Sequence, residues 1–364
     1  MRTISALILL LTVNTLYAQP DFKTRLDTFF AGQPANQPGF ACSIQKKGSV
    51  IYRNAAGLAN TRSGTPLDSL TNFRMASVTK QFTAMGILLL EKDGILSVDD
   101  PIGRWLPELP ASQGQHILIR HLLTHSSGLL DYESLIPPTQ TTQVLDTDVL
   151  RLLSGNDKTY FPAGSRFQYS NSGYCLLALI IERASKESYP QFIQDRIFAP
   201  LHMDNSRVYE KDEPIPHRAM GYARDSSGQI IPSDQSVTSA TKGDGGVYTS
   251  LSDYAKWINA LGRNTLLPLA AALRRLRFPI NELHGRYYAA GWFIDLNSPQ
   301  LLFHSGSTCG FNNFVIQLPG DDTSIVYFSN IADNSDPFKT ILKILHQSGY
   351  PDLSSVMVLH DQTR

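Results

Sequence analysis

The chain has 364 residues, of which 42% are hydrophobic and 18% are charged, so it is long enough to bury a large core. Lysine plus arginine and aspartate plus glutamate both number 32, and no long run of one sign occurs. This balance gives no electrostatic reason to expect nucleic acid or an anionic membrane as a partner. A small-molecule or short-peptide ligand fits the composition better.

Residues 1–18 are predicted to form a cleavable signal peptide. Arg2 is followed by the apolar run 4–11, and the small residue Ala18 ends the segment. The apolar run is too short for a permanent membrane span, and no later stretch has the length and hydrophobicity of one. We therefore expect an exported protein, periplasmic or secreted, without a stable membrane span.

Three cysteines, Cys42, Cys175 and Cys309, are too few for a disulfide scaffold. At most one bridge can form among them, and the sequence leaves open whether any pair does. It favours the interpretation that all three are small buried apolar residues. Neither Cys-x-x-Cys nor His-Glu-x-x-His occurs, so neither a metal site nor another cofactor is expected.

The hydrophobic pattern predicts a sheet lobe assembled from both ends of the chain, about 19–98 and 262–345. Four strand-like runs near the C-terminus should form a meander. The expected elements are a first helix (22–30), a hairpin (40–45 and 50–54), a buried helix that begins at Ser77, the four strand-like runs (287–295, 301–304, 314–318 and 324–330) and a closing helix to His346.

Between these parts, from about 99 to 261, proline-bounded loops alternate with short helices and strand signals nearly vanish. The prediction is therefore an α/β (α+β) protein with an antiparallel sheet, flanking helices and an inserted all-helical lobe. A cleft should lie between the lobes. Residues 346–364 form a tail without a strong pattern. The helices expected in the insertion are 119–125, 148–153, 173–186, 191–198 and 254–261.

A serine and a lysine stand at the start of the otherwise apolar helix, in Ser77-Val78-Thr79-Lys80. Residues three apart share a helix face, so the Lys80 amine can lie beside the Ser77 hydroxyl, as in an activated nucleophile. Ser-x-x-Lys also begins at Ser43 and Ser239. Ser43 is expected in a strand and Ser239 in a loop, so only Ser77 opens a helix.

A second cluster, Tyr169-Ser170-Asn171, is expected on a loop that enters a helix. A tyrosine held near a lysine ammonium can be kept as phenolate and act as a general base, and asparagine can bind an amide. The same spacing recurs at Tyr52 and Asn54 in a predicted strand. Taken alone, a structural loop tyrosine is the better interpretation.

A third cluster, His304-Ser305-Gly306-Ser307, is expected to end a strand. Gly306 would let a substrate backbone approach, and the N–H of Ser307 could face a carbonyl under attack. His304 could donate a hydrogen bond or transfer a proton there. From these residues alone, a polar strand end is an equally good interpretation. The other histidines, His121 and His125 included, are interpreted as structural or surface residues.

The three clusters, in this order and at these distances, resemble the motifs of the serine β-lactamase and penicillin-binding-protein superfamily. The resemblance is to the branch that contains class C β-lactamases, D-Ala-D-Ala carboxypeptidases and related esterases. It covers about residues 22–345 and implies a β-lactamase/transpeptidase-like fold, with one hydrolase domain over 19–345. Further stretches that match are 122–129, 161–174, 200–203 and 245–250.

The resemblance implies roles for the residues of the first two clusters. Ser77 would be the nucleophile that becomes acylated. Lys80 and Tyr169 together would take its proton and pass it to the leaving group. Asn171 would hold the amide of the substrate.

For the third cluster the resemblance implies substrate binding and an oxyanion hole. The backbone N–H groups of Ser77 and Ser307 would stabilise the oxyanion, with Gly306 between strand and substrate. His304 stands where class C β-lactamases usually have the lysine of Lys-Thr-Gly. A permanent cation is thus replaced by a group that is mostly neutral at pH 7, so efficient β-lactam hydrolysis is not expected.

The function expected from the sequence is an exported serine hydrolase that works through an acyl-enzyme on Ser77. Its substrate would be a D-amino-acid peptide, as for a D-Ala-D-Ala carboxypeptidase, or an ester. One alternative is a class C-like β-lactamase. Another is a catalytically silent binding protein with the same fold, against which the presence of Ser77, Lys80 and Tyr169 argues. The oligomeric state stays open.

Overall fold

The computed structural model describes residues 21–281, 283–297 and 299–362. The signal peptide predicted for residues 1–18 lies outside these ranges. Within them, no helix combines the length and the hydrophobicity needed to cross a membrane.

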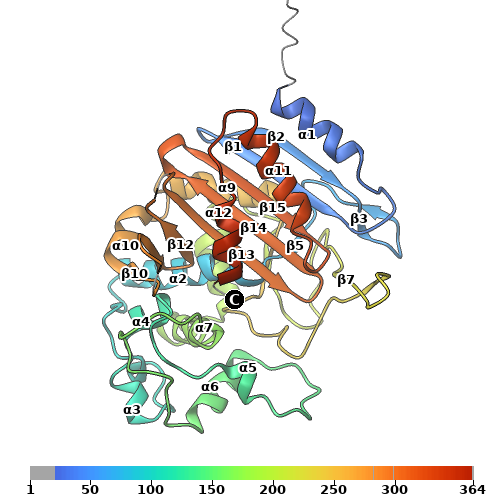
Figure 1. Ribbon diagram of the computed structural model, residues 1–364. Helices are drawn as coiled ribbons and strands as arrows, with labels where there is room; N and C mark the ends of the chain where they lie inside the picture. The colour runs from blue at the N-terminus through green and yellow to red at the C-terminus, as the bar shows by residue number, and fades with distance from the viewer. Residues whose placement is uncertain (1–20, 282, 298, 363–364) are drawn as a thin grey trace, which may run out of the picture.

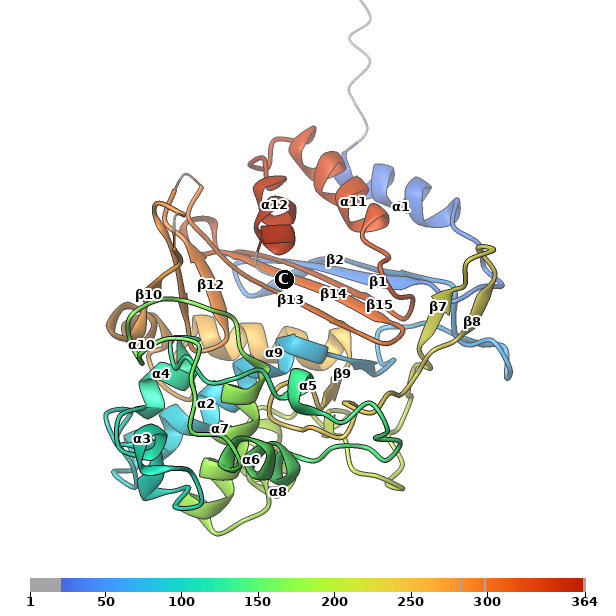
Figure 2. The same cartoon turned by 60° about the horizontal axis from the view of Figure 1, so that its bottom comes forward.

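An eight-stranded antiparallel sheet divides the protein into layers, in the order β10-β11-β12-β13-β14-β15-β1-β2. Helices α1 (Phe22–Ala31), α11 (Asp336–His346) and α12 (Ser355–Gln362) lie over one face (Figure 2). The opposite face is covered by α9 (Leu251–Gly262) and α2 (Lys80–Lys92), with the remaining helices below them. The sheet is therefore buried on both faces.

Both ends of the chain supply strands, as predicted (Figure 1). The N-terminal hairpin joins the C-terminal meander where β1 pairs with β15, from Phe40 opposite Ser329 to Lys46 opposite Thr323. The two strands of this pairing lie almost the whole length of the sequence apart. The strands are β1 (Phe40–Lys46), β2 (Ser49–Ala56), β10 (Phe278–Pro279), β11 (Arg286–Ala289), β12 (Trp292–Asp295), β13 (Leu301–Thr308), β14 (Phe311–Leu318) and β15 (Thr323–Ser329).

The single strand predicted over 287–295 is wrong, because the chain reverses in the middle of it. β11 and β12 are joined at Ala290 and Gly291, whose φ angles are 46° and 83°. A Cβ at Gly291 would lie 2.6 Å from the backbone of Gln81, so this turn packs directly on the start of α2. The turn is itself buried, which is why the apolar run continues through it without a sequence signal.

β13 is longer than predicted and does not end at His304. Its pairing with β12 covers only 301–303, whereas its pairing with β14 continues to Thr308. From His304 onward, one edge of β13 is therefore left uncovered by β12. The tail also differs from the prediction, because it contains α12, with Leu353 and Val356 buried beside the core.

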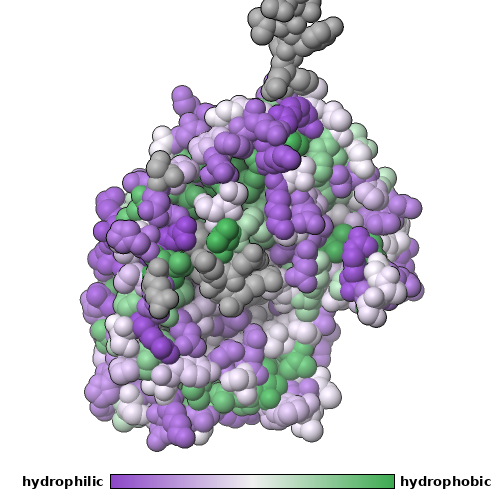
Figure 3. Space-filling view, in the orientation of Figure 1, coloured by the Kyte–Doolittle hydropathy of each residue, from purple (hydrophilic) through white to green (hydrophobic). Residues whose placement is uncertain are grey.

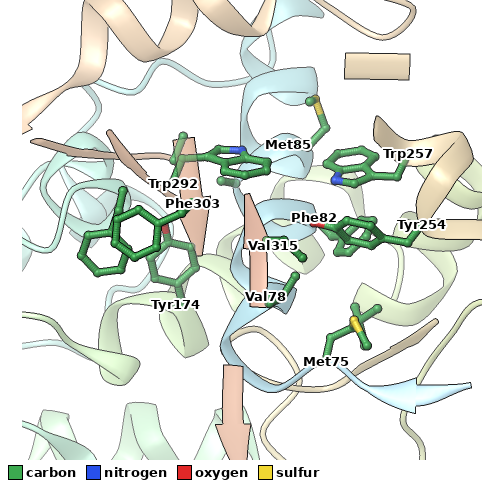
Figure 4. Close-up of a cluster of buried hydrophobic side chains, with 14 of the residues drawn as sticks. Met75, Val78, Phe82, Met85, Tyr174, Tyr254, Trp257, Trp292, Phe303 and Val315 are labelled. Carbon is green, nitrogen blue, oxygen red and sulfur yellow. The ribbon is translucent and has the colours of Figure 1, made fainter. Parts of the chain in front are cut away.

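Helix α2 is the core helix that the sequence indicated, since every residue from Lys80 to Leu90 is buried. Phe82 contacts two rings of α9, Trp257 at 4.5 Å and Tyr254 at 6.4 Å between ring centroids. Trp292, Phe303 and Val315 of the sheet belong to the same cluster (Figure 4). The start of α2 is thus held between the sheet and the second lobe.

The insertion contains the predicted helices, and it also contains short strands that the sequence did not indicate. One of them, β9 (Val247–Thr249), pairs with β5 (Phe73–Arg74) just before Ser77, which ties the insertion to that segment. The helical elements are η2 (Ile102–Arg104), α3 (Ala111–Gly114), α4 (Ile119–Leu123), α5 (Tyr132–Leu135), α6 (Asp146–Ser154), α7 (Asn171–Ser185), α8 (Tyr189–Ile193) and η3 (Gln194–Phe198).

The remaining short elements complete the chain. Outside the insertion these are β3 (Leu58–Asn60), β4 (Thr65–Pro66), α10 (Leu269–Leu276) and η4 (Pro319–Asp321), and within it β6 (Arg207–Val208), β7 (Tyr222–Arg224) and β8 (Ile230–Pro232).

All three cysteines are free, and Cys42 and Cys175 are buried, whereas Cys309 is partly exposed. Burial raises the pKa of the Cys42 thiol to about 12, so it is inert at neutral pH. Hydrophilic residues spread over most of the face in Figure 3, with hydrophobic residues in small separate patches.

Removing the Phe82 ring should destabilise the protein, because it leaves a cavity between α2 and α9. Phe82→Ala is expected to lower the free energy of unfolding by about 3–5 kcal/mol. Leu70, which is 40% exposed, is the control, and Leu70→Ala should change it by less than about 0.5 kcal/mol. Urea unfolding of both variants measures this, and equal losses would contradict the described core.

Candidate active site

Ser77 lies in a short 3-10 turn, η1 (Ala76–Thr79), that runs directly into α2. The sequence predicted Ser77 in the first turn of that helix, so the position is right and the local geometry is tighter. Two hydrogen bonds with the backbone of Val247 fix the turn: the Met75 N–H donates to the Val247 carbonyl at 2.8 Å, and the Val247 N–H donates to the side-chain Oγ1 of Thr79 at 3.0 Å. Ser77 itself is partly exposed.

The amine of Lys80 is fully buried and lies beside Ser77. Its Nζ donates to Ser77 Oγ at 3.0 Å, to Asn171 Oδ1 at 2.8 Å and to the Asp244 carbonyl at 3.0 Å. An ammonium group has three N–H donors, so each of them has an acceptor. These acceptors come from η1, α7 and the loop before β9, so the site is assembled from distant parts of the chain.

Two tyrosine rings line the same amine. Lys80 Nζ lies 5.0 Å from the ring centre of Tyr169 and 5.5 Å from that of Tyr174. The Tyr174 hydroxyl donates to the Leu123 carbonyl at 3.1 Å, and burial raises its pKa. By contrast, Tyr169 is partly exposed, and among the described residues none hydrogen bonds its hydroxyl. Tyr169 is therefore the tyrosine beside Lys80 that can meet a ligand.

His304 lies next to this group, with its ring centre 6.3 Å from that of Tyr169. Its ring is buried and both nitrogens have partners: Nδ1 lies 2.7 Å from the Ser305 carbonyl and Nε2 lies 3.1 Å from the Tyr288 hydroxyl. A carbonyl only accepts, so Nδ1 donates to Ser305, whereas Nε2 accepts from or donates to the Tyr288 hydroxyl according to the protonation of the ring. A donor role toward a ligand would therefore require His304 to change partner.

Gly306 brings the uncovered edge of β13 against the turn that carries Ser77. A Cβ at this position would lie 2.1 Å from the Met75 carbonyl oxygen and 3.2 Å from the Ala76 Cβ, which no side chain can satisfy. Glycine is thus required by a close backbone approach rather than by its φ angle. Ser307, the next residue, is exposed.

An acidic wall, formed by Asp131, Glu133 and Asp244, faces Lys80 from the second lobe. Asn171 Nδ2 donates to Glu133 Oε1 at 3.2 Å, so the amide links the lysine to this wall. Burial, and then Asp131 and Asp244, raise the pKa of the Glu133 carboxyl, against the opposing effects of Asn171 and Lys80. These three residues are not predicted from the sequence, because they lie far apart from Ser77 along the chain.

Asp146, on α6, fixes the loop that supplies the Asp244 carbonyl. It is buried and accepts from the backbone N–H groups of Lys242 at 2.9 Å and Gly243 at 3.3 Å. Burial, followed by Asp244, raises the pKa of its carboxyl to about 7. This contact was also missed, since nothing in the sequence around Asp146 marks it as different from a helix-start aspartate.

The two competing Ser-x-x-Lys matches do not bring serine and lysine together. On β1, the Ser43 hydroxyl is buried and has no hydrogen-bond partner among the residues that the structure describes, while Lys46 pairs with Asp321 on the surface. In the loop before β9, Ser239 contacts Cys309, and Lys242 pairs with Glu210. The structural context that singled out Ser77 is thus confirmed.

No group of three or more His, Cys, Asp or Glu side chains that could hold a metal ion occurs in the part of the chain that the structure describes. The chemistry available from these residues is a hydroxyl, an amine with a full set of acceptors, a phenol and carboxylates. A serine hydroxyl beside a lysine and a tyrosine can be deprotonated and can attack a carbonyl carbon.

A family model described as Beta-lactamase matches residues 26–348, nearly the whole chain. The chain belongs to the beta-lactamase family. It is therefore a member of a serine hydrolase family that includes penicillin-binding proteins, and the family resemblance of its three motifs is confirmed.

Two bacterial proteins are similar to this chain over most of its length. Penicillin-binding protein 4* of Bacillus subtilis (strain 168) is 33% identical over 315 residues, which covers 81% of this chain and 69% of that protein. Protein flp of Staphylococcus aureus (strain MRSA252) is 29% identical over 327 residues, 87% of this chain and 64% of the relative. The chain thus spans about two thirds of the length of these relatives.

Solved structures of the family have the same fold. The octameric penicillin-binding protein homologue from Pyrococcus abyssi matches 88% of this chain and 74% of its own, with a TM-score of 0.74 and 26% identity. The penicillin binding protein from Bacillus halodurans matches 84% of this chain and 95% of its own, with a TM-score of 0.72 and 26% identity. The predicted fold class is therefore confirmed.

Adding a methyl group to Gly306 should separate β13 from η1 and slow any reaction at Ser77. Gly306→Ala is expected to lower the acylation rate by about a hundredfold, since a shift of about 1 Å at a reacting group has that effect. Gly320→Ala is the matched control, because no atom of the described part of the chain lies within 4 Å of a Cβ there. Labelling rates with a fluorophosphonate measure both, and a wild-type rate for Gly306→Ala would contradict the close approach.

Proposed function

We propose that the protein is an exported serine hydrolase that forms an acyl-enzyme on Ser77. Its proposed substrates are D-amino-acid peptides, as for a D-Ala-D-Ala carboxypeptidase, or esters. The observation that carries this proposal is the 3.0 Å contact between Lys80 Nζ and Ser77 Oγ inside a fully satisfied set of hydrogen bonds. The family membership supports the same reaction type.

The proposed reaction has two steps. Ser77 Oγ attacks the carbonyl carbon of the substrate, its proton passes to the Tyr169 and Lys80 pair, and the backbone N–H groups of Ser77 and Ser307 stabilise the oxyanion. The pair then protonates the leaving group as the C–N or C–O bond breaks. Water hydrolyses the acyl-enzyme by the reverse proton transfers, which restores Ser77.

Tyr169 is the proposed first acceptor of the proton. The Lys80 amine is placed to donate three hydrogen bonds, as an ammonium does, and its Nζ lies 5.0 Å from the centre of the Tyr169 ring. Lys80 would then stay positively charged throughout, while Tyr169 accepts the proton and releases it. Asn171 accepts from Lys80 through Oδ1 and donates one Nδ2 hydrogen to Glu133, so its second Nδ2 hydrogen is the one proposed to bind the substrate amide.

Penicillin binding without rapid β-lactam turnover is part of the proposal. The relative in Bacillus subtilis is named a penicillin-binding protein, and the usual lysine of the third motif is replaced here by His304. The alternative is a class C-like β-lactamase, and rapid hydrolysis of cephalosporins would favour it. A silent binding protein is the second alternative, and the absence of any covalent adduct would favour it.

The position of Glu133 limits which acyl groups the proposed substrate can carry. Asn171 is proposed to hold the substrate amide, and Glu133 Oε1 accepts from the same side chain at 3.2 Å. A carboxylate beside the acyl part of the substrate attracts an ammonium and repels another carboxylate. The proposed substrate therefore carries a free amino group on its acyl side.

The first test is covalent labelling of Ser77. Incubation with a penicillin or a fluorophosphonate should add one adduct, which peptide mass spectrometry places on Ser77. Ser77→Ala should lose the adduct completely, whereas Ser43→Ala and Ser239→Ala, the serines of the other two matches, should keep it. Persistence of the adduct in Ser77→Ala would refute the assignment of the nucleophile.

The second test concerns Glu133 and uses paired substrates. Glu133→Gln should raise KM about tenfold or more for a D-amino-acid amide with a free amino group, since a hydrogen bond to a charged group contributes about 1.5–3 kcal/mol. The N-acetylated form of the same substrate should be little affected. Glu187→Gln, on an exposed residue after α7, is the control. Equal effects on both substrates would exclude the ammonium subsite.

A further inference from the structure

His125 lies behind Tyr169, in a cluster of aromatic rings between the two lobes. His125 is 1% exposed, and its backbone has a φ of 54°, a left-handed conformation that is uncommon for residues other than glycine, although asparagine, aspartate and histidine adopt it more often than the rest. Such a backbone persists only when its surroundings hold it in place. The contacts of His125 show what this conformation places around it.

His125 accepts hydrogen bonds from the residues on either side of Tyr169 in the sequence. The backbone N–H of Gln168 donates to the His125 carbonyl at 2.8 Å, and the backbone N–H of Ser170 donates to His125 Nδ1 at 3.1 Å. The residues immediately before and after Tyr169 are therefore both fixed to the same histidine. This loop has no strand or helix of its own to set its position.

The imidazole ring also contacts the Tyr169 ring directly. Their centroids are 4.2 Å apart with an angle of 35° between the planes, and Tyr288 lies on the ring of His125 at 4.4 Å. Tyr169 also stacks with Phe293, with 6.3 Å between the ring centroids and an angle of 8° between the planes. His125 thus fixes both the backbone and the ring plane of Tyr169.

The chemistry of His125 suits a fixed neutral group. Because Nδ1 accepts a hydrogen bond from Ser170, the proton of the neutral ring lies on Nε2, which is buried and has no partner among the described residues. Burial, followed by Lys80 and His304, lowers the pKa of His125 well below its usual value. A charged imidazolium would oppose the Lys80 ammonium close by.

We propose that His125 is the positioning residue of Tyr169: it holds the phenol beside Lys80 and acts on acylation through Tyr169 alone. This inference rests on the role that the proposed function gives to Tyr169. His121 and His125 were both interpreted from the sequence as structural or surface residues. His121 Nδ1 accepts from the Leu118 N–H at 3.1 Å, and its ring lies beside Gly164 of the tyrosine loop rather than beside Tyr169, which makes it a matched control.

Two substitutions of His125 separate its role as a hydrogen-bond acceptor from the packing of its ring. His125→Asn keeps an acceptor at the position of Nδ1 and tolerates a positive φ. His125→Phe keeps an aromatic ring and loses the acceptor. The acylation rate should fall about a hundredfold in His125→Phe, with KM little changed, whereas His125→Asn should retain activity to within about tenfold. His121→Phe should acylate like the wild type.

A double-mutant cycle tests the route of the effect. If His125 acts through Tyr169, then His125→Phe should have no further effect on acylation in a Tyr169→Phe background, although thermal unfolding reports its structural effect in both backgrounds. Additive losses in the cycle would overturn the proposal. So would a wild-type acylation rate in His125→Phe.

The outcomes also separate this proposal from the proposed function. Full acylation by Tyr169→Phe would overturn the role of Tyr169 and with it the premise. Loss in Tyr169→Phe together with a wild-type rate in His125→Phe would overturn the positioning role alone. If His125→Phe does not fold, His125→Asn decides: activity within about tenfold supports the proposal, and a hundredfold loss with native thermal unfolding overturns it.

Discussion

The buried amine of Lys80 is the constraint on which the rest of the site depends. Moving an isolated ammonium group out of water costs several kcal/mol, so its three hydrogens must all meet acceptors. Those acceptors are Ser77, Asn171 and the Asp244 carbonyl, and they belong to three separate segments. Satisfying one lysine therefore fixes the turn before α2, the start of α7 and the loop before β9 relative to one another.

Two further layers hold these segments in place. Asp146 fixes the loop that carries the Asp244 carbonyl, and the aromatic rings around His125 fix the loop that carries Tyr169. Both layers are buried and both use backbone N–H groups as donors. The residues that meet a ligand, Ser77 and Tyr169, are thus partly exposed, whereas Asp146 and His125, which help to orient the site, are buried. Preorganised sites are built in this way.

The sequence predicted the pair Ser77 and Lys80 because a spacing of three on a helix translates directly into distance. It predicted the sheet from both chain ends because each strand has its own apolar pattern. It could not predict the turn at Ala290 and Gly291, whose burial hides the break, or the contacts of Glu133 and Asp146 with segments nearly 40 and 100 residues away. Such contacts depend on tertiary packing, which no local pattern encodes.

The central claim is that Ser77, Lys80 and Tyr169 act as one unit on a carbonyl seated beside β13. A crystal structure of the protein after reaction with a fluorophosphonate tests it most directly, because the phosphonyl group imitates the tetrahedral intermediate. The account predicts a bond from Ser77 Oγ to phosphorus, one phosphonyl oxygen bound by the Ser77 and Ser307 N–H groups, and the Tyr169 hydroxyl within hydrogen-bonding distance of Ser77 Oγ. An adduct with that oxygen in solvent and Tyr169 turned away would contradict it.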